Sequence, residues 1–358
     1  MNNKFVIWMN IPSIHQASLF GRLFDSNEDI IVAYYLPKNV CDERNESGFI
    51  TEINSSKEVV ICDLIDLDKT LVDWKDRTHI IPGIGDSFCR KLLCKLIFNR
   101  VKWGHWSEHY RIKMNWFLTL PVRIFYSVLL NLSSQFVIVQ SDLAVKQFKY
   151  LGVNTRKIKK FNYTISKDRI IKESSKKQSD IATFVYLGRF EKVKGVDLVL
   201  HAAKYCSDNN IKAHFTLVGS GTLESHIRNY ISQFGLEKTL DVRLPIDNAN
   251  VVSELSNYTA LILPSIYDGW GVVVNEALSA GIPVIVSNKA GSSDLIKNSE
   301  CGFIFDGKDE LFSICETVAD SGFDVSTFDK CKRLAFKNSS EEKYMEFIDI
   351  VLGENDNS

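Results

Sequence analysis

The most constraining feature of this sequence is a loop that carries two carboxylates, Asp268 and Glu276, on either side of the tripeptide Gly269-Trp270-Gly271. The apolar run 261–263 before it predicts a strand, and the apolar residues after it predict a helix. A strand end, a glycine loop and a helix start together favour anion binding, and glycine lets a ligand approach the backbone. Glu276, about a turn and a half into the helix, can reach hydroxyl groups of the same ligand. The loop therefore predicts a ligand that combines a phosphate with a diol.

Four more glycine-containing segments accompany this loop, at residues 186–195, 217–221, 280–287 and 301–304. In order and spacing, the five segments resemble the retaining, nucleotide-sugar-dependent glycosyltransferases of family 4 over about residues 181–310. The resemblance implies an α/β chain with the GT-B fold, in which two Rossmann-like domains face each other across a cleft. The sequence departs from the family pattern at Asp268, where Glu is the common form.

Arg189 and Lys194 flank a turn that begins at Gly188, and two cations at this spacing can hold a diphosphate from two sides. The resemblance implies that they bind the donor diphosphate and stabilise the departing nucleoside diphosphate. The alternative is a surface turn with scattered basic residues.

By the same resemblance, Glu276 accepts hydrogen bonds from the ribose hydroxyls and Asp268 contacts hydroxyls of the transferred sugar. Asp268 is also a good helix N-cap, which is the competing interpretation. The N–H groups of Gly269, Trp270 and Gly271 are candidates for binding sugar or phosphate oxygens, whereas the Trp270 side chain is as well explained as a core residue.

Two further segments are assigned to the donor by resemblance. Gly219 and Gly221 form a loop that lies near the nucleotide in the family, although a plain tight turn explains them equally well. A dinucleotide fingerprint is incomplete here, because Glu224 stands at the third glycine position. Leu244 falls where the family places the segment that contacts the base.

The N-terminal half carries fewer signals. Residues 10–15 lack the glycine-rich loop usual in the family, and 82–86 is a second candidate for it. The segment 103–109 predicts a strand end, with His105 and Glu108 as candidates for acceptor contact or for receiving the acceptor proton. A structural histidine, or a His-x3-His metal site formed by His105 and His109, are the alternatives.

The length of 358 residues suits two α/β domains. We predict an N-terminal domain at 1–165, a polar linker at 166–181, a C-terminal nucleotide-sugar domain at 182–338, a helix at 339–352 that crosses back to the N-terminal domain, and a disordered tail at 353–358. The apolar run near the N-terminus is too short for a signal peptide, and no spanning helix is expected; the nearest approach is 116–132. The eight cysteines, at 41, 62, 89, 94, 206, 301, 315 and 331, are expected to be free thiols in a reducing cytosol.

Charge is distributed unevenly along the chain, although the net charge is −1. Residues 87–180 hold 19 Lys/Arg against 5 Asp/Glu, together with several aromatic residues. This combination favours an anionic membrane surface. A solvated helix face with a basic linker is the competing interpretation, and nucleic acid is disfavoured because no nucleic-acid motif accompanies the charge.

These observations predict a metal-independent, hexosyltransferase-type enzyme that moves a sugar from a UDP- or GDP-sugar, with no other cofactor, to a saccharide hydroxyl. The acceptor is expected to be lipid-linked, in O-antigen or capsule synthesis, with the protein in the cytoplasm or peripheral on the inner membrane. Three alternatives stay open: an NDP-sugar 2-epimerase of the same architecture, a nicotinamide dehydrogenase, and a non-catalytic GT-B partner subunit. The sugar, the base, the acceptor, the linkage and the oligomeric state are not specified by these motifs.

Overall fold

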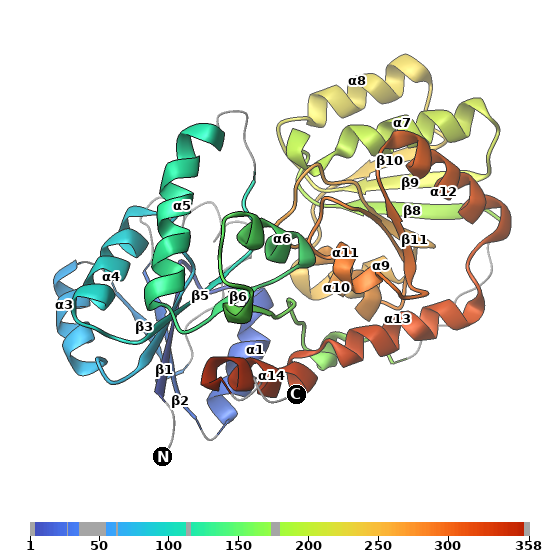
Figure 1. Cartoon of the computed structure of the whole chain (residues 1–358). Coiled ribbons are helices and arrows are strands. Elements are labelled where there is room, and N and C mark those ends of the chain that lie inside the picture. Colours follow the sequence, from blue (N-terminus) through green and yellow to red (C-terminus); the bar gives the residue numbers. More distant parts are fainter. Residues whose placement is uncertain are drawn as a thin grey trace. The chain divides into compact units, whose positions relative to one another are not determined.

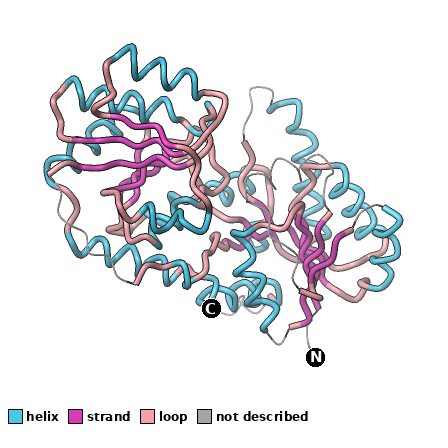
Figure 2. The backbone as a smooth tube through the Cα atoms, turned by 180° about the vertical axis from the view of Figure 1, so that it is seen from behind, coloured by secondary structure: helices cyan, strands magenta, loops and turns pink. Residues whose placement is uncertain are grey.

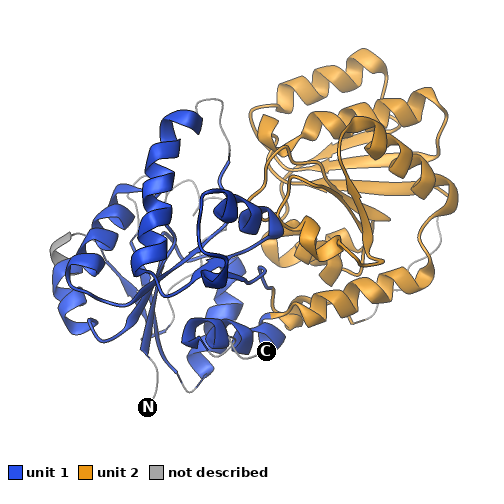
Figure 3. Cartoon of the chain, viewed as in Figure 1, with its two compact units in different colours: residues 1–164, 340–358 blue, residues 165–339 orange. Residues whose placement is uncertain are grey.

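A computed structural model describes residues 4–26, 28–35, 55–61, 64–111, 116–172 and 180–353. The chain divides into two compact units, one of residues 1–164 with 340–358 and the other of residues 165–339 (Figure 3). Each unit contains one parallel sheet covered by helices, which is the α/β architecture expected from the chain length and the family resemblance.

The N-terminal unit is built on a seven-stranded parallel sheet of order β3-β2-β1-β4-β5-β6-β7 (Figure 1). Its described strands are β1 (Lys4–Met9), β2 (Asp29–Tyr34), β3 (Glu58–Val60), β4 (Thr78–Ile81), β5 (Trp103–Ser107), β6 (Val137–Val139) and β7 (Ile158–Lys160). The described helices are α1 (Ile14–Asp25), α3 (Leu64–Asp73), α4 (Ser87–Phe98), α5 (Trp116–Ser133) and α6 (Asp142–Tyr150), with a short 3-10 helix η1 (Thr155–Lys157). The central strands are apolar on both faces because helices cover both sides of the sheet.

The last helix, α14 (Ser340–Leu352), belongs to the N-terminal unit although it follows the C-terminal unit in the sequence. Arg22 of α1 pairs with Glu341 at 3.1 Å. The Phe347 ring packs against the rings of Trp106 and Phe161, with centroids 5.0 and 5.2 Å apart. The helix predicted at 339–352 therefore closes the first unit by an aromatic cluster and an ion pair.

The C-terminal unit contains a six-stranded parallel sheet of order β10-β9-β8-β11-β12-β13. Figure 2 shows the strands of both units in magenta and the helices in cyan. The strands are β8 (Ala182–Leu187), β9 (Ala213–Val218), β10 (Leu240–Arg243), β11 (Ala260–Leu263), β12 (Val284–Ser287) and β13 (Gly302–Phe305). The helices are α7 (Val196–Asp208), α8 (Glu224–Phe234), α9 (Val251–Leu255), α10 (Val273–Ser279), α11 (Ser293–Ile296), α12 (Lys308–Ser321) and α13 (Val325–Lys337). Three 3-10 helices complete it: η2 (Lys167–Arg169), η3 (Lys192–Lys194) and η4 (Asn248–Asn250). In this order the chain leaves β8 on one side for β9 and returns on the other for β11, and ligands of such sheets bind at that switch point.

The predicted linker differs from the observed structure. Residues 167–169 form η2, and the Ile171 N–H donates to the Ser279 carbonyl of α10 at 3.0 Å. The start of the predicted linker is therefore part of the C-terminal unit, and it was misassigned because its polar sequence lacks an apolar periodicity. Residues 173–179, the tail residues 354–358 and Cys41 and Cys62 lie outside the described residues, whereas the other six cysteines are free thiols as expected.

Candidate functional site

The predicted donor residues of the C-terminal unit follow three neighbouring strands at the carboxyl edge of the sheet. Arg189 and Lys194 follow β8, Gly219 follows β9, and Asp268 follows β11. Because parallel strands end at the same edge, loops that are distant in the sequence become neighbours here. The switch point between β8 and β11 therefore carries most of the residues that the sequence had singled out.

Glycines join these loops by close backbone packing. Gly195 has φ +70°, and a Cβ placed on it would lie 2.0 Å from the Pro264 carbonyl oxygen. A Cβ on Gly219 would lie 2.0 Å from the Gly188 carbonyl oxygen, and one on Gly221 would meet the Phe190 backbone at 2.6 Å. Glycine is needed at these positions even without a ligand, because the loops after β8, β9 and β11 contact one another through their main chains.

Lys194 and Asp268 form an ion pair in the described site. Lys194 Nζ lies 2.7 Å from Asp268 Oδ2, and the Ser265 hydroxyl donates to the same oxygen at 3.3 Å. Asp268 is not a helix cap, because α10 begins at Val273 and Val272 occupies the cap position. The N-cap interpretation is therefore wrong, and the carboxylate instead pairs with Lys194, one of the two cations predicted to bind the donor diphosphate.

Arg189 is exposed, and its guanidinium makes no hydrogen bond or ion pair within the part of the chain that the structure describes. Its backbone is fixed, because the Tyr186 hydroxyl donates to the Arg189 carbonyl at 2.6 Å. Arg189 therefore has a fixed backbone and a guanidinium that is available to an anion. Its planar guanidinium can donate two parallel hydrogen bonds to phosphate oxygens.

The loop before α10 offers main-chain donors. The N–H groups of Gly269, Trp270 and Gly271 have no acceptor among the described residues. The Trp270 side chain is a core residue, 2% exposed, and its Nε1 donates to Asn275 Oδ1 at 2.7 Å. Only the Trp270 backbone can therefore serve a ligand. The helix itself has 7 residues, so its dipole adds less than the sequence pattern suggested.

Glu276 is buried, at 3% exposure, and faces a cation that the sequence analysis missed. Arg169 Nη1 lies 3.4 Å from Glu276 Oε1, and Arg169 Nη2 donates to the Asn248 carbonyl at 2.7 Å. Burial raises the pKa of the Glu276 carboxyl to about 7, and the Arg169 charge opposes that rise. Glu276 Oε1 has no hydrogen-bond partner among the described residues, so it keeps the capacity to accept one from a ligand hydroxyl.

Two more buried acceptors near this edge were not predicted. Asn288 Oδ1 and the Ser292 hydroxyl are buried without a hydrogen-bond partner in the described structure. A Cβ on Gly271 would lie 3.0 Å from Ser292 Oγ, so this hydroxyl borders the glycine loop. The sequence indicates these two residues only by their place in the loop that follows the apolar strand β12.

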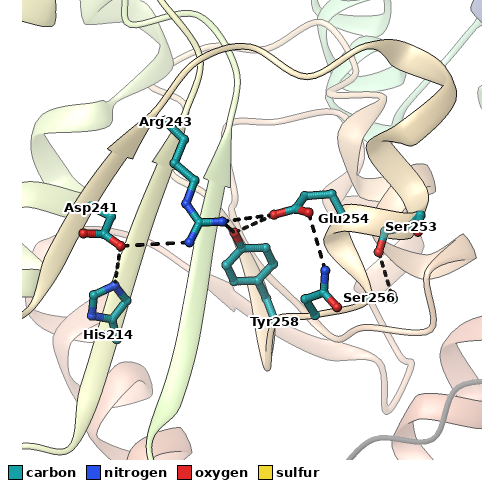
Figure 4. A network of polar contacts seen from close by, with 8 residues as sticks. His214, Asp241, Arg243, Ser253, Glu254, Ser256 and Tyr258 are labelled. Atoms are coloured by element: carbon teal, nitrogen blue, oxygen red, sulfur yellow. Dashed lines mark hydrogen bonds and ion pairs between the residues drawn. The ribbon is translucent and has the colours of Figure 1, made fainter.

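The segment that contains Leu244 begins at the end of β10, where the side chain of Arg243 is held by its neighbours. Leu244 is 77% exposed and follows Arg243, the last residue of β10. Figure 4 shows Arg243 between Asp241 and Glu254, with ion-pair distances of 4.0 and 3.3 Å, and with the Tyr258 hydroxyl at 3.2 Å. The Gly219 N–H donates to the Arg243 carbonyl at 3.1 Å, which ties this segment to the glycine loop after β9.

The N-terminal candidates divide between interior and surface. His105 is 0% exposed, its ring nitrogens lie 2.9 Å from the Tyr126 hydroxyl and 2.7 Å from Ser107 Oγ, and burial lowers its pKa to about 3. The prediction that His105 contacts an acceptor is therefore wrong; it is a structural histidine. Both of its nitrogens are engaged, which also removes the His-x3-His site with His109. Glu108 is exposed, and no group of three metal-ligating side chains occurs in the described ranges.

The raised pKa of Glu276 generates a prediction about stability. The usual carboxyl pKa is 4.5, so the folded state holds the proton more tightly than the unfolded chain. This contribution to the free energy of unfolding is fully present below pH 4.5 and is lost as pH rises through about 7. Glu276→Gln, which cannot ionise, should gain about 2–3 kcal/mol relative to wild type between pH 5 and 8. Urea unfolding across that range measures it, with the exposed Glu237→Gln as control; parallel wild-type and Glu276→Gln profiles would contradict the assignment.

Comparisons with known proteins agree with this geometry. Residues 167–313 match the family model described as glycosyl transferases group 1. A relative from Escherichia coli, named UDP-Gal:alpha-D-GlcNAc-diphosphoundecaprenol alpha-1,3-galactosyltransferase, is 33% identical over 132 residues, which is 35% of this chain and 33% of that protein. The chain thus aligns with about a third of this relative's length.

Solved structures match nearly the whole chain at low identity. Anabaena Alr3699/HepE in complex with UDP superposes with a TM-score of 0.74 and 13% identity, covering 99% of this chain and 100% of that one. The lipopolysaccharide outer core galactosyltransferase WaaB gives a TM-score of 0.73 and 14% identity, covering 98% and 99%. Likeness at such identity concerns the fold. Residues 167–313 therefore resemble glycosyl transferases group 1, and the chain that contains them has the GT-B fold.

Proposed function

We propose that the protein is a retaining glycosyltransferase whose C-terminal unit binds a nucleotide-sugar donor at the carboxyl edge of its sheet. The observation that carries the proposal is the juxtaposition there of an uncommitted guanidinium, unsatisfied main-chain N–H groups and the buried Glu276 carboxylate, whose Oε1 faces Arg169 but accepts no hydrogen bond from the described residues. Cations and N–H groups suit a diphosphate, and the carboxylate suits ribose hydroxyls. The UDP and UDP-glucose named with the Anabaena structures support a UDP-sugar, with a GDP-sugar as the other candidate.

In this mechanism Arg189 and Lys194 stabilise the nucleoside diphosphate as the glycosidic bond breaks. Fixed positive charge placed where negative charge grows lowers the barrier, which is the reason that we propose a metal-independent reaction. Retention follows if the acceptor hydroxyl attacks from the face that the diphosphate leaves and the departing phosphate takes its proton. Such a route needs no strong protein base, and the loss of His105 as a candidate is consistent with it.

For the acceptor, we propose a saccharide hydroxyl on a lipid-linked precursor of a surface polysaccharide such as O-antigen or capsule. The name of the Escherichia coli relative contains such an acceptor, an alpha-D-GlcNAc-diphosphoundecaprenol, which supports this class of acceptor. A lipid-linked substrate places the reaction at a membrane, and we propose the cytoplasmic face. The basic block at 87–180 supports attraction to anionic lipid headgroups there.

A non-catalytic partner subunit stays the second candidate because of one observation. The Lys194–Asp268 ion pair neutralises one of the two predicted phosphate-binding cations, and Asp268 is a methylene shorter than the Glu of the family. An epimerase of the same architecture is distinguished by product, since it isomerises the donor without an acceptor.

The first test is donor turnover by the purified full chain against UDP- and GDP-sugars. Slow hydrolysis of one donor is expected, and Arg189→Ala should lower kcat for it about 100-fold, the scale of losing one transition-state contact to a charged group, while raising the donor KM. Lys192→Ala, an exposed cation of the same turn, is the matched control and should leave both constants nearly unchanged. Equal loss in the two variants would reject the role of Arg189, and a total lack of wild-type turnover with donor binding would favour the non-catalytic subunit.

The ribose assignment is tested by binding rather than by turnover. Glu276→Gln should weaken UDP binding about tenfold or more, because a hydrogen bond to a carboxylate is replaced by a weaker neutral one. Wild-type affinity should also fall from pH 8 to pH 6, as the carboxyl with a pKa of about 7 becomes protonated. Isothermal titration calorimetry measures both effects, and the part of the pH dependence due to this carboxyl should disappear in the variant. Unchanged affinity in Glu276→Gln would exclude the ribose contact.

Substitutions at Asp268 separate the catalytic proposal from the non-catalytic one. Asp268→Ala should reduce kcat at least tenfold, because it removes the partner that orients Lys194 and a contact to the sugar. Asp268→Glu should keep kcat within about fivefold of wild type, since the longer side chain restores the common family acid. A wild type without turnover that gains it through Asp268→Glu would identify the natural chain as the non-catalytic form.

A further inference from the structure

Helix α5 (Trp116–Ser133) presents an unusual surface for a water-soluble domain. Its exposed large apolar side chains include Phe117 at 59%, Leu118 at 65%, Phe125 at 63% and Leu132 at 78% exposure. Val122, Ile124 and Val128 are exposed between them. With about 100° per residue, these seven residues share one side of the helix over roughly 160°. We call this set the apolar face of α5; contiguous apolar surface of this kind marks an interaction site.

The opposite side of α5 is anchored in the N-terminal unit. Tyr126 and Leu130 are 3% and 0% exposed, and the Tyr126 hydroxyl lies 2.9 Å from His105 Nδ1. The Arg123 guanidinium lies 4.6 Å from the centre of the Tyr110 ring. Lys157 Nζ donates to the carbonyls of Leu130 and Asn131 at 3.0 and 2.8 Å, which fixes the end of the helix. One side of α5 is therefore committed to the protein, and only the apolar face is left to a partner.

This anchoring decides how α5 can meet a membrane. Among the described helices, α5 alone is long and apolar enough to cross a bilayer by length and composition, whereas the sequence analysis expected no such helix. Spanning would require the Tyr126–His105 contact and the Lys157 cap to break and Arg123 to enter the hydrocarbon. A helix fixed along one side can instead lie parallel to the surface, with its free side at the depth of the acyl chains.

The charge of the N-terminal unit favours a bilayer over a second copy of the chain as the partner of the apolar face of α5. Residues 87–164, which include α4, α5 and α6, hold 14 Lys/Arg against 2 Asp/Glu. Two copies that met through α5 would bring two such blocks together, and like charges oppose that association. Three of these cations, Arg100, Lys102 and Arg156, line a hollow at the amino ends of β4 and β5. Anionic lipid headgroups supply the complementary charge.

We propose that α5 lies in the interface of a bilayer that contains anionic lipids, with its apolar face inserted among the acyl chains. This attachment goes beyond electrostatic attraction of a basic block, because inserted apolar side chains keep the protein bound when salt screens the charges. The inference depends on the N-terminal unit alone and does not rest on the proposed transferase activity.

Sedimentation of the full chain with phosphatidylethanolamine vesicles, with and without phosphatidylglycerol, tests the proposal. Wild-type protein should bind vesicles that contain phosphatidylglycerol, and at least half of the bound protein should stay bound in 0.5 M NaCl, where the Debye length is only about 4–5 Å. The double variant L118E/F125E should bind at least tenfold more weakly. Phe336→Glu, which changes a 48% exposed Phe of α13, is the matched control and should bind as wild type does.

Two further measurements keep the result interpretable. Far-UV circular dichroism and the thermal transition should match between wild type and L118E/F125E, because both side chains are exposed. In the variant F125W, brominated acyl chains should quench the added tryptophan fluorescence, as only insertion brings the ring to that depth. Vesicle binding that is abolished by salt and unaffected by L118E/F125E would overturn the proposal. So would a lipid-free wild-type dimer that L118E/F125E converts to a monomer without a change in vesicle binding.

Discussion

The close approach of Gly195 to the Pro264 carbonyl is the contact on which the candidate donor site depends. Only a glycine fits there, because any side chain would begin 2.0 Å from a main-chain oxygen. The approach brings the turn after β8 onto the loop after β11, and the Ile266 N–H donates to the Val193 carbonyl at 3.0 Å beside it. Lys194, next to Gly195, is thereby placed within 2.7 Å of Asp268. A backbone contact at the switch point thus sets the charge pattern of the site.

Local motifs explain why much of this site could be predicted from the sequence. Arg189, Lys194 and Asp268 follow the ends of β8 and β11 in the connecting loops, and Glu276 lies in α10, the helix after the second loop, so the order of these motifs along the chain indicates one edge of a parallel sheet. The glycines were recognised but not fully understood. For Gly219 the sequence leaves contact with the nucleotide and a plain tight turn equally open, whereas the structure shows that this glycine makes room for the Gly188 carbonyl. Whether Trp270 faces a ligand or the core depends on its packing, which the motif does not specify.

The errors arise where contacts join segments that are distant in the sequence. Arg169 stands in a stretch whose polar composition predicted a linker, and nothing local indicates that it faces Glu276. His105 lies in a buried central strand, so its polar neighbours in the sequence gave a misleading signal of surface chemistry. The sequence of α5 has apolar residues on all sides of the helix, so it does not indicate which side packs against the protein and which side faces outward. Only the packing of its Tyr126 side against the unit shows which face is left uncovered.

Unsatisfied polar groups provide an argument for the donor site that is independent of any motif. Within the described part of the C-terminal unit, the buried side-chain atoms without a hydrogen-bond partner belong to Glu276, Asn288, Ser292 and Ser339. The first three follow β11 and β12, at the same edge where the loop N–H groups of residues 269–271 lack acceptors. Each such group costs about 1–3 kcal/mol of stability, and elsewhere proteins rarely leave them unpaired. The place of these three side chains at the carboxyl edge of the C-terminal sheet is explained if a polar ligand supplies the missing partners. A nucleoside diphosphate offers both kinds, since its phosphate oxygens accept from N–H groups and its ribose hydroxyls donate to carboxylate and carbonyl oxygens.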